Sequence, residues 1–208
     1  MPNIYYSYYT PICNSIPAVA RQEHMLGREL LRKGLEHFYS LSFSPESLPS
    51  VLAALENGKP YLKGYPEIHF NISHCNGLAV CAFHNHPIGI DAEQPGYFPR
   101  VLINKALSAE EKSFLQAISA SPVLEQEWFY RFWTLKEAYV KLSGTGLDVI
   151  LTDFSFHFSD TAAENDHFSV RCSNPDVSCY QQKLNHGQIL SLCCSGSMDK
   201  VCFYPHHA

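Results

Sequence analysis

The chain has 208 residues, of which 46% are apolar and 17% are charged, and its formal net charge is −5. This length and apolar content indicate a folded protein with a sizeable core and exclude a disordered segment. The acidic balance argues against a general nucleic-acid-binding protein, and no apolar run reaches the roughly 18–20 residues that a membrane span requires.

The start of the chain lacks the basic residues and apolar stretch that are typical of a secretory signal, so we expect a cytoplasmic protein. The eight cysteines include no C-x-x-C pair, and Cys193 and Cys194 are adjacent. This spacing suits neither a zinc site nor a set of disulfides. We interpret the cysteines as reduced thiols that act as small buried apolar side chains.

In the first half of the chain, the spacing of apolar residues predicts one long helix among several strands. The predicted elements are a strand at 4–10, a helix at 17–38, and strands at 68–73, 78–83 and 88–92. On the helix, Arg21, Arg28 and Arg32 are spaced by seven and four residues and therefore share one face. That face is either a solvated surface or a basic surface for an anionic ligand.

The second half begins after a stretch rich in proline and glycine at 95–99. Ser108 and Glu111 have the spacing of a capping box, which predicts a helix that continues to about residue 119. A longer helix is expected at 124–143, with Gly144 at its stop position. Short strands are predicted at 154–158, 168–172, 178–182, 189–194 and 201–204. The whole pattern predicts an α+β fold with two halves, 1–98 and 99–208.

Two carboxylates near the end of the strand at 88–92 are candidate metal ligands. Asp91 and Glu93 are two residues apart, so their side chains point to the same face of a strand. Neighbouring carboxylates are stabilised by a cation between them, and oxygen ligands of this kind suit Mg²⁺. The alternative is a solvated strand end next to the turn at Pro95.

The long helix carries a second group of charged residues. Glu137 and Lys141 are four residues apart and share a face, as many surface ion pairs do. Lys136 falls on the apolar side of the same helix, where a fully solvated lysine is not expected. Its ammonium group either extends past the apolar stripe to solvent or meets an anion such as phosphate.

The segment that contains Asn71, Ser73 and His74 ends a predicted strand, and Lys59 lies between a glycine and a proline. Serine and histidine at a strand end are suited to bind phosphate, although a plain turn explains them equally well. The chain contains neither a P-loop nor a Rossmann glycine pattern, so a bound nucleotide would not be held by those folds.

Together these motifs resemble the 4′-phosphopantetheinyl transferases, and in particular their surfactin-type (Sfp-like) group. The matching segments are 58–60 (GKP), 70–74 (FNISH), 89–93 (GIDAE) and 132–138 (FWTLKEA), followed by Lys141. The order and the spacing agree from Lys59 to Gly146. Each motif is weak alone, but the combination is specific.

The resemblance implies a pseudo-dimer of two similar α/β halves with the active site in the cleft between them. Such enzymes transfer the phosphopantetheine arm of coenzyme A to a serine of an apo acyl or peptidyl carrier protein and release adenosine 3′,5′-bisphosphate. By position, the resemblance makes Asp91, Glu93 and Glu137 the Mg²⁺ ligands. It also implies phosphate contacts for Lys136 and Lys141.

Further roles follow from the same resemblance. Ser73 and His74 would bind the 3′-phosphate of coenzyme A, with Lys59 near the nucleotide. The arginine expected on the first helix falls on Glu23, and we choose the nearby Arg28 in its place. Glu111 occupies the place of a general base for the serine hydroxyl, with Glu137 and a metal-bound water as alternatives.

The resemblance also implies a monomer with an acidic carrier protein as its partner and with no nucleic-acid or membrane partner. Docking on a net-acidic protein would depend on local basic residues, for which we choose Arg32, Lys33, Arg100 and Lys105. Two alternatives remain open. One is a Mg²⁺-dependent phosphohydrolase of a small diphosphate, and the other is a carrier-binding module without activity.

Overall fold

The computed structural model describes residues 1–13, 15–144, 150–159 and 167–206. The strands are β1 (Asn3–Tyr8), β2 (Leu52–Ala54), β3 (Pro60–Leu62), β4 (His69–Cys75), β5 (Leu78–His84), β6 (Ile88–Glu93), β7 (Phe156–Phe158), β8 (His167–Phe168), β9 (Val170–Cys172), β10 (Val177–Lys183), β11 (Ile189–Ser195) and β12 (Cys202–Pro205). The helices are α1 (Ile16–Tyr39), α2 (Leu48–Val51), α3 (Val101–Ala106), α4 (Ala109–Ala117), α5 (Pro122–Ser143) and the 3₁₀ helix η2 (Leu151–Asp153). Within these residues no helix has the length and apolar content to cross a membrane.

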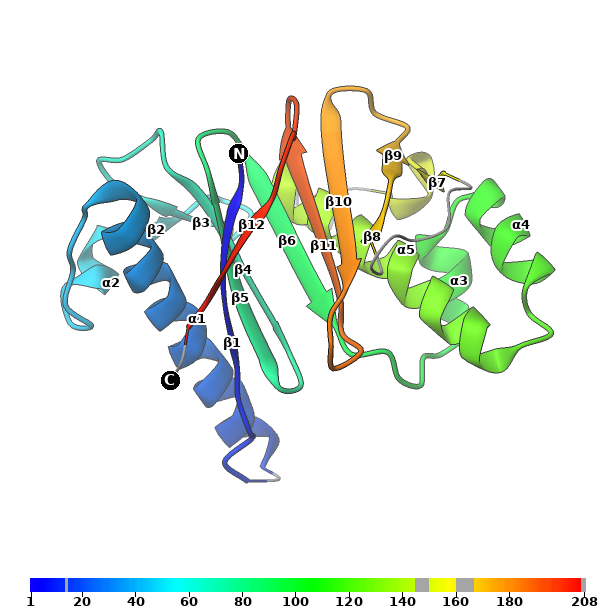
Figure 1. Ribbon diagram of the computed structural model, residues 1–208, viewed down its shortest axis with the longest axis horizontal. Coiled ribbons are helices and arrows are strands. Elements are labelled where there is room, and N and C mark those ends of the chain that lie inside the picture. Colours follow the sequence, from blue (N-terminus) through cyan, green and yellow to red (C-terminus); the bar gives the residue numbers. More distant parts are fainter. Residues whose placement is uncertain (14, 145–149, 160–166, 207–208) are drawn as a thin grey trace.

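The strands form two main sheets that lie next to each other (Figure 1). The first has the order β12-β1-β5-β4, and the second has the order β6-β11-β10-β9-β7, with β8 also paired to β10. One hydrophobic cluster contains residues of both sheets, among them Ile4 and Val80 from the first and Ile90 and Leu192 from the second. The mixed α+β fold that the sequence predicts is confirmed.

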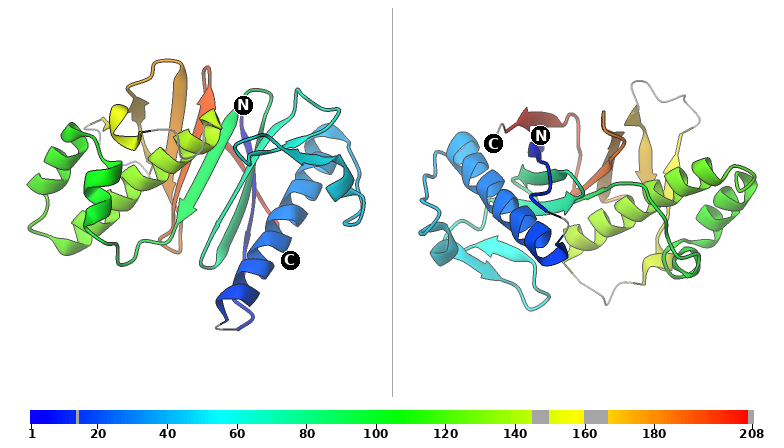
Figure 2. Two further views of the ribbon diagram at one scale, coloured as in Figure 1. Left: turned by 180° about the vertical axis from the view of Figure 1, so that it is seen from behind. Right: turned by 90° about the horizontal axis from the view of Figure 1, so that it is seen from below.

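Each main sheet is covered by one long helix (Figure 2). Helix α1 packs on β4 and β5, and α5 packs on β6 and β11. The approach of α1 depends on Gly34, because a Cβ atom there would overlap with the ring of Phe83. Gly89 has the same role under α5, because its Cβ would overlap with the backbone of Ala138 and Leu142. Small residues at these two points bring both helices close to their sheets.

The boundaries of the predicted elements agree with the structure to within a few residues. The capping box is present, because Ser108 Oγ accepts from Glu111 N and Glu111 Oε2 accepts from Ser108 N. Gly144 ends α5 in a left-handed conformation at φ 64°. The short elements α2, β2, β3 and α3 were not predicted from the sequence.

The sheets do not follow the predicted division at residue 98. Strand β6 lies before the boundary but belongs to the second sheet, and β12 lies after it but pairs with β1 in the first. The register of this parallel pair joins Asn3 to Cys202. The chain therefore crosses between the halves in both directions, and the division into two domains stays a prediction.

Candidate functional site

Strand β6 and helix α5 together form the candidate site. On β6, Ile90 and Ala92 belong to the cluster between the sheets, so Gly89, Asp91 and Glu93 face the opposite side. Because α5 crosses β6 directly over Gly89, the helix residues Glu137 and Lys141 come to the same side as the two carboxylates.

Asp91 and Lys141 form the closest contact of the site. Lys141 Nζ donates to Asp91 Oδ1 at 2.6 Å. The Asp91 side chain is 6% exposed, and the Lys141 side chain is 30% exposed. The second oxygen, Asp91 Oδ2, is buried without a hydrogen-bond partner among the described residues. A buried carboxylate oxygen in this condition is costly unless a cation or a donor meets it.

The other two carboxylates are electrostatically coupled to Asp91. The pKa of Glu93 is raised to about 7, chiefly by burial and then by Asp91 and Glu137, while Lys141 acts in the opposite direction. The pKa of Glu137 is also raised, first by burial and then by Asp91. A site in which a neighbouring carboxylate raises the pKa values of Glu93 and Glu137 favours a cation, because positive charge removes the repulsion.

The donor set therefore fits Mg²⁺ by its chemistry, since all three groups offer carboxylate oxygens and one oxygen lacks a partner. Within the described ranges, however, no three side chains of His, Cys, Asp or Glu lie close enough together to hold a metal ion as they stand. The assignment of Asp91, Glu93 and Glu137 as metal ligands stays a prediction.

Ser73 and His74 do not converge on one place. Ser73 is buried, and its hydroxyl donates to Asp91 Oδ1 at 3.0 Å. His74 points to the opposite face of β4, where its Nδ1 lies 3.2 Å from Glu23 Oε2 on α1. Adjacent side chains on a strand face opposite ways. The two side chains therefore face opposite sides of β4, and their common role in binding the 3′-phosphate stays a prediction.

Lys136 and Glu111 form a buried ion pair away from the carboxylates of β6. Lys136 Nζ lies 2.9 Å from Glu111 Oε2, and their side chains are 0% and 1% exposed. The ammonium group also donates to the carbonyl oxygens of Leu151 and Phe154, and Glu111 Oε1 accepts from Phe156 N at 2.8 Å. Neither side chain is accessible in this structure, and the roles of Lys136 as a phosphate contact and of Glu111 as the base stay predictions.

Lys59, which was expected near the nucleotide, is half-buried. Its Nζ donates to the carbonyl oxygens of Ile88 and Leu142, each at 3.0 Å. Burial lowers its pKa to about 8. Lys59 thus joins the loop before β3 to β6 and to the end of α5, and it lines a small cavity of about 230 Å³ together with Lys141 and Asn71.

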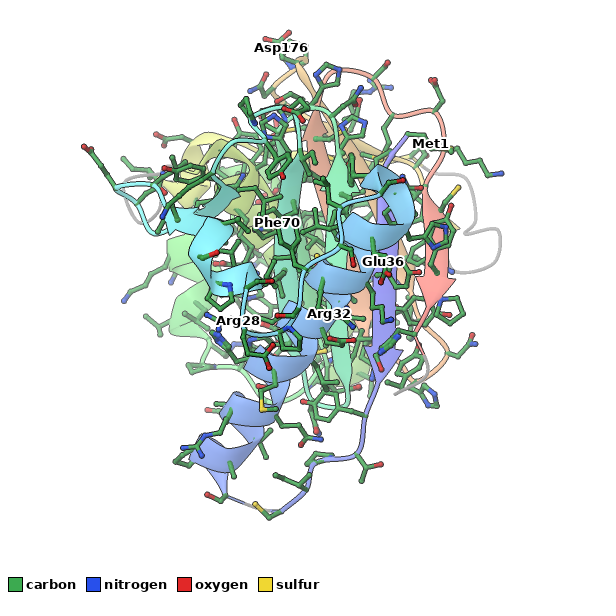
Figure 3. The ribbon with its side chains drawn as sticks, turned by 90° about the vertical axis from the view of Figure 1, so that its left-hand side faces the viewer. Met1, Arg28, Arg32, Glu36, Phe70 and Asp176 are labelled. Carbon is green, nitrogen blue, oxygen red and sulfur yellow. The ribbon has the colours of Figure 1, made fainter. Side chains whose placement is uncertain are left out.

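Arg28 is exposed on α1, one turn before Arg32 (Figure 3). It lines a groove of about 930 Å³ together with Arg21, Met25 and Leu48. Arg32 lies along the same groove but is already bound, because its Nη2 lies 2.6 Å from Glu29 Oε1. Arg28 and Arg21 therefore remain the better candidates for an anion in this groove.

Three of the four basic residues that we chose for carrier docking form ion pairs within the chain, and Arg32 with Glu29 is the first of them. Arg100 forms an ion pair with Glu125 at 2.5 Å, and Lys33 Nζ lies 3.8 Å from Glu36 Oε2. Lys105 is exposed on α3. The charge that these residues offer to a partner is thus smaller than the sequence suggested.

The roles of Asn71 and Trp133 were not predicted from the sequence. Asn71 Oδ1 accepts from Ile90 N at 2.9 Å, next to Asp91. The side chain of Trp133 hydrogen-bonds to Glu93, which lowers the pKa of that carboxyl against the larger effect of burial. The spacing of two between Asn71 and Ser73 is a signal that the sequence already contained.

A protein-family model described as the 4′-phosphopantetheinyl transferase superfamily matches residues 87–193, which is just over half of the chain. The chain belongs to this superfamily. The matched range includes β6, α5 and β11 up to Cys193, and hence all the carboxylates of the candidate site.

Two relatives place this superfamily member near the surfactin-type group. A 4′-phosphopantetheinyl transferase of Bacillus subtilis is 33% identical over 158 residues, covering 75% of this chain and 65% of the relative. The 4′-phosphopantetheinyl transferase Sfp of Bacillus subtilis strain 168 is 34% identical over 131 residues, covering 63% of this chain and 56% of the relative. The predicted resemblance is confirmed, and the chain spans less than two thirds of the length of each of these relatives.

Among solved structures, the crystal structure of holo-[acyl-carrier-protein] synthase from Thermotoga maritima is similar with a TM-score of 0.41 and 19% identity. The match covers 54% of this chain and 64% of that one.

Proposed function

We propose that this superfamily member transfers the 4′-phosphopantetheine group from coenzyme A to a serine of an apo acyl or peptidyl carrier protein. The single observation that carries the proposal is the meeting of Asp91, Glu93 and Glu137 with Lys141 at the crossing of β6 and α5. This set combines the charges that a Mg²⁺ ion and a diphosphate require. The names of the relatives support the same activity.

In the proposed reaction, the serine oxygen of the carrier forms a bond to the phosphorus that bears the pantetheine arm. The bond from this phosphorus to the oxygen shared with the second phosphate breaks, and adenosine 3′,5′-bisphosphate leaves with the electron pair. When bound, Mg²⁺ neutralises charge on the diphosphate. Asp91, Glu93 and Glu137 would hold the ion, and Lys141 would stabilise a phosphate oxygen.

The serine hydroxyl must lose its proton during this attack. Glu111 is inaccessible in its ion pair with Lys136, so the chain offers Glu137 as the carboxylate for this step.

The contacts with coenzyme A are part of the proposal. Lys59 and Lys141 line one cavity beside the site, and Arg21 and Arg28 line the groove on α1. Cationic side chains with an apolar surround suit a nucleotide with phosphates. His74 remains a candidate for a phosphate contact, since its side chain is 44% exposed.

The finer architecture and setting are proposals as well. We take the two helix-covered sheets as the two halves of a pseudo-dimer, with the active site in the cleft where β4, β6 and α5 meet. We also propose that the protein is a cytoplasmic monomer and that it binds an acidic carrier protein. Lys105 and Arg100 on and beside α3 are the candidate docking residues, supported by the exposed Tyr97 and Val101.

The proposal is tested by incubating the protein with coenzyme A, MgCl₂ and an apo carrier protein. Mass spectrometry should show the carrier gaining one phosphopantetheine group at its serine, and chelation of the metal with EDTA should prevent this gain. Hydrolysis of coenzyme A with an unmodified carrier would favour the phosphohydrolase instead.

A variant sharpens the same test. Glu137→Gln removes a carboxylate with little change in volume, and we expect it to lower the rate of transfer by about a hundredfold or more while the protein stays folded. Glu110→Gln is the matched control, because Glu110 is exposed on α4. Equal turnover in Glu137→Gln and the parent would defeat the assignment of Glu137.

A further inference from the structure

Strand β6 lies at the end of its sheet and pairs with β11 along one edge only. The other edge faces β4, which belongs to the first sheet, and the two strands are close neighbours. An unpaired strand edge in the interior leaves backbone N–H groups without acceptors, which is costly. Something must therefore satisfy the free edge of β6.

Two side chains of β4 supply the acceptors. Asn71 Oδ1 accepts from Ile90 N at 2.9 Å, and Ser73 Oγ accepts from Ala92 N at 3.2 Å. Both side chains are buried, at 6% and 5% exposure. Donors and acceptors are each spaced by two residues, which is the period of a strand. These two hydrogen bonds form a short ladder in which side-chain oxygens of β4 take the place of backbone carbonyl oxygens.

The two hydrogen bonds of this ladder lie on either side of Asp91. The peptide N–H before this residue and the one after it are both held from β4, so the backbone that carries Asp91 is fixed on both sides. The hydroxyl of Ser73 also donates to Asp91 Oδ1 at 3.0 Å and accepts from Lys141 Nζ at 3.3 Å. Ser73 thus contacts the backbone, the carboxylate and the lysine of the site.

From this geometry we infer that Asn71 and Ser73 are positioning residues of the transferase. They complete the free edge of β6, join the two sheets, and fix both the backbone and the side chain of Asp91. Ser73 acts on the carboxylate directly, and Asn71 acts only through the backbone of Ile90. This inference rests on the proposed function for its catalytic part, but the ladder itself does not depend on that function.

The ladder is tested first by amide hydrogen exchange, which needs no activity. In Asn71→Leu and Ser73→Ala, loss of the acceptor should accelerate exchange at Ile90 and at Ala92, respectively, by about ten- to a hundredfold. Ser7→Ala is the control, because Ser7 is a buried serine on β1 that donates to the carbonyl of Tyr8. Unchanged exchange at both amides would overturn the ladder.

The catalytic part is tested on the same variants by steady-state kinetics and by Mn²⁺ binding measured by electron paramagnetic resonance. Ser73→Ala should lower kcat about tenfold or more with a small change in the KM for coenzyme A, and should weaken Mn²⁺ binding. Ser73→Thr, which keeps the hydroxyl, should recover most of the loss.

The outcomes separate the two claims. A parent protein without transferase activity contradicts the proposed function, whereas the exchange experiment still decides the ladder. An active parent whose Ser73→Ala variant keeps its kcat and its Mn²⁺ affinity overturns the positioning role. A rise in KM for coenzyme A at constant kcat overturns it too, because that result would assign Ser73 to substrate binding.

Discussion

Lys136 and Glu137 are neighbours in the sequence but face different environments. Successive residues of a helix are rotated by about 100°, so Lys136 points into the core of the second half while Glu137 points toward Asp91. Motif resemblance assigned both to the site, because a motif gives the order of residues and not the direction of each side chain. The position of Lys136 on the apolar side of the helix indicated its burial, but the sequence did not indicate that Glu111 is its partner.

Glu111→Gln tests the structural role of this pair. Glutamine still completes the capping box with Ser108, so the substitution chiefly leaves the buried Lys136 ammonium without its partner. We expect the free energy of unfolding to fall by about 3 kcal/mol in urea titrations. The folded fraction should keep its transferase rate, whereas a loss of kcat in folded protein would restore Glu111 as a base.

At the scale of elements, the spacing of apolar residues and the capping motifs predicted the helices and strands, because both features depend only on nearby residues. The capping box at Ser108 and the stop at Gly144 illustrate this. The same-face placement of Asp91 and Glu93 followed from the period of a strand. The crossing of α5 over β6 was not predictable, because it depends on contacts between segments that are far apart in the chain.

Gly89 makes that crossing possible, which Gly89→Ala tests. A Cβ at this position would overlap with backbone atoms of Ala138 and Leu142, which no rotamer change can relieve. We expect the free energy of unfolding to fall by about 3 kcal/mol and transfer activity to fall with it. Gly96→Ala is the control, because its Cβ would make only an ordinary contact at 3.8 Å. Equal stability of the two variants would contradict the close crossing.

At the scale of the whole molecule, side chains of the first half of the chain bond to the backbone of β6 and α5 and so join the two main sheets. Asn71 and Ser73 bond to β6, and Lys59 bonds to both β6 and α5. Lys59 was expected near a nucleotide, and the sequence did not indicate its hydrogen bonds to two carbonyl oxygens. Such contacts between distant segments are set by the tertiary arrangement.

The half-buried ammonium group of Lys59 should make the free energy of unfolding depend on pH. Burial lowers its pKa from 10.5 to about 8, so between these values the unfolded chain binds more protons than the folded one. Stability from this group therefore rises with pH across that window. Because Lys59 is only half-buried, we expect the stability of the parent to rise by about 1 kcal/mol relative to Lys59→Met between about pH 7.5 and 9.5.

Urea titrations of both proteins at the two pH values measure this difference, in which the titration of cysteines and tyrosines cancels. Lys63→Met, at an exposed lysine on the same segment, should show no such change relative to the parent. A constant difference between the parent and Lys59→Met would contradict the burial of this ammonium group.

The pairing of β12 with β1 bears on how the chain folds during synthesis. Strand β1 lies inside the first sheet, between β12 and β5, and its partner Cys202 is joined to Asn3 across nearly the whole sequence. Until residues 202–205 emerge from the ribosome, β1 presents an unpaired edge that other chains can join. Completion of this sheet requires contact between distant segments, which is slow, and newly made chains should be prone to aggregate before it is complete.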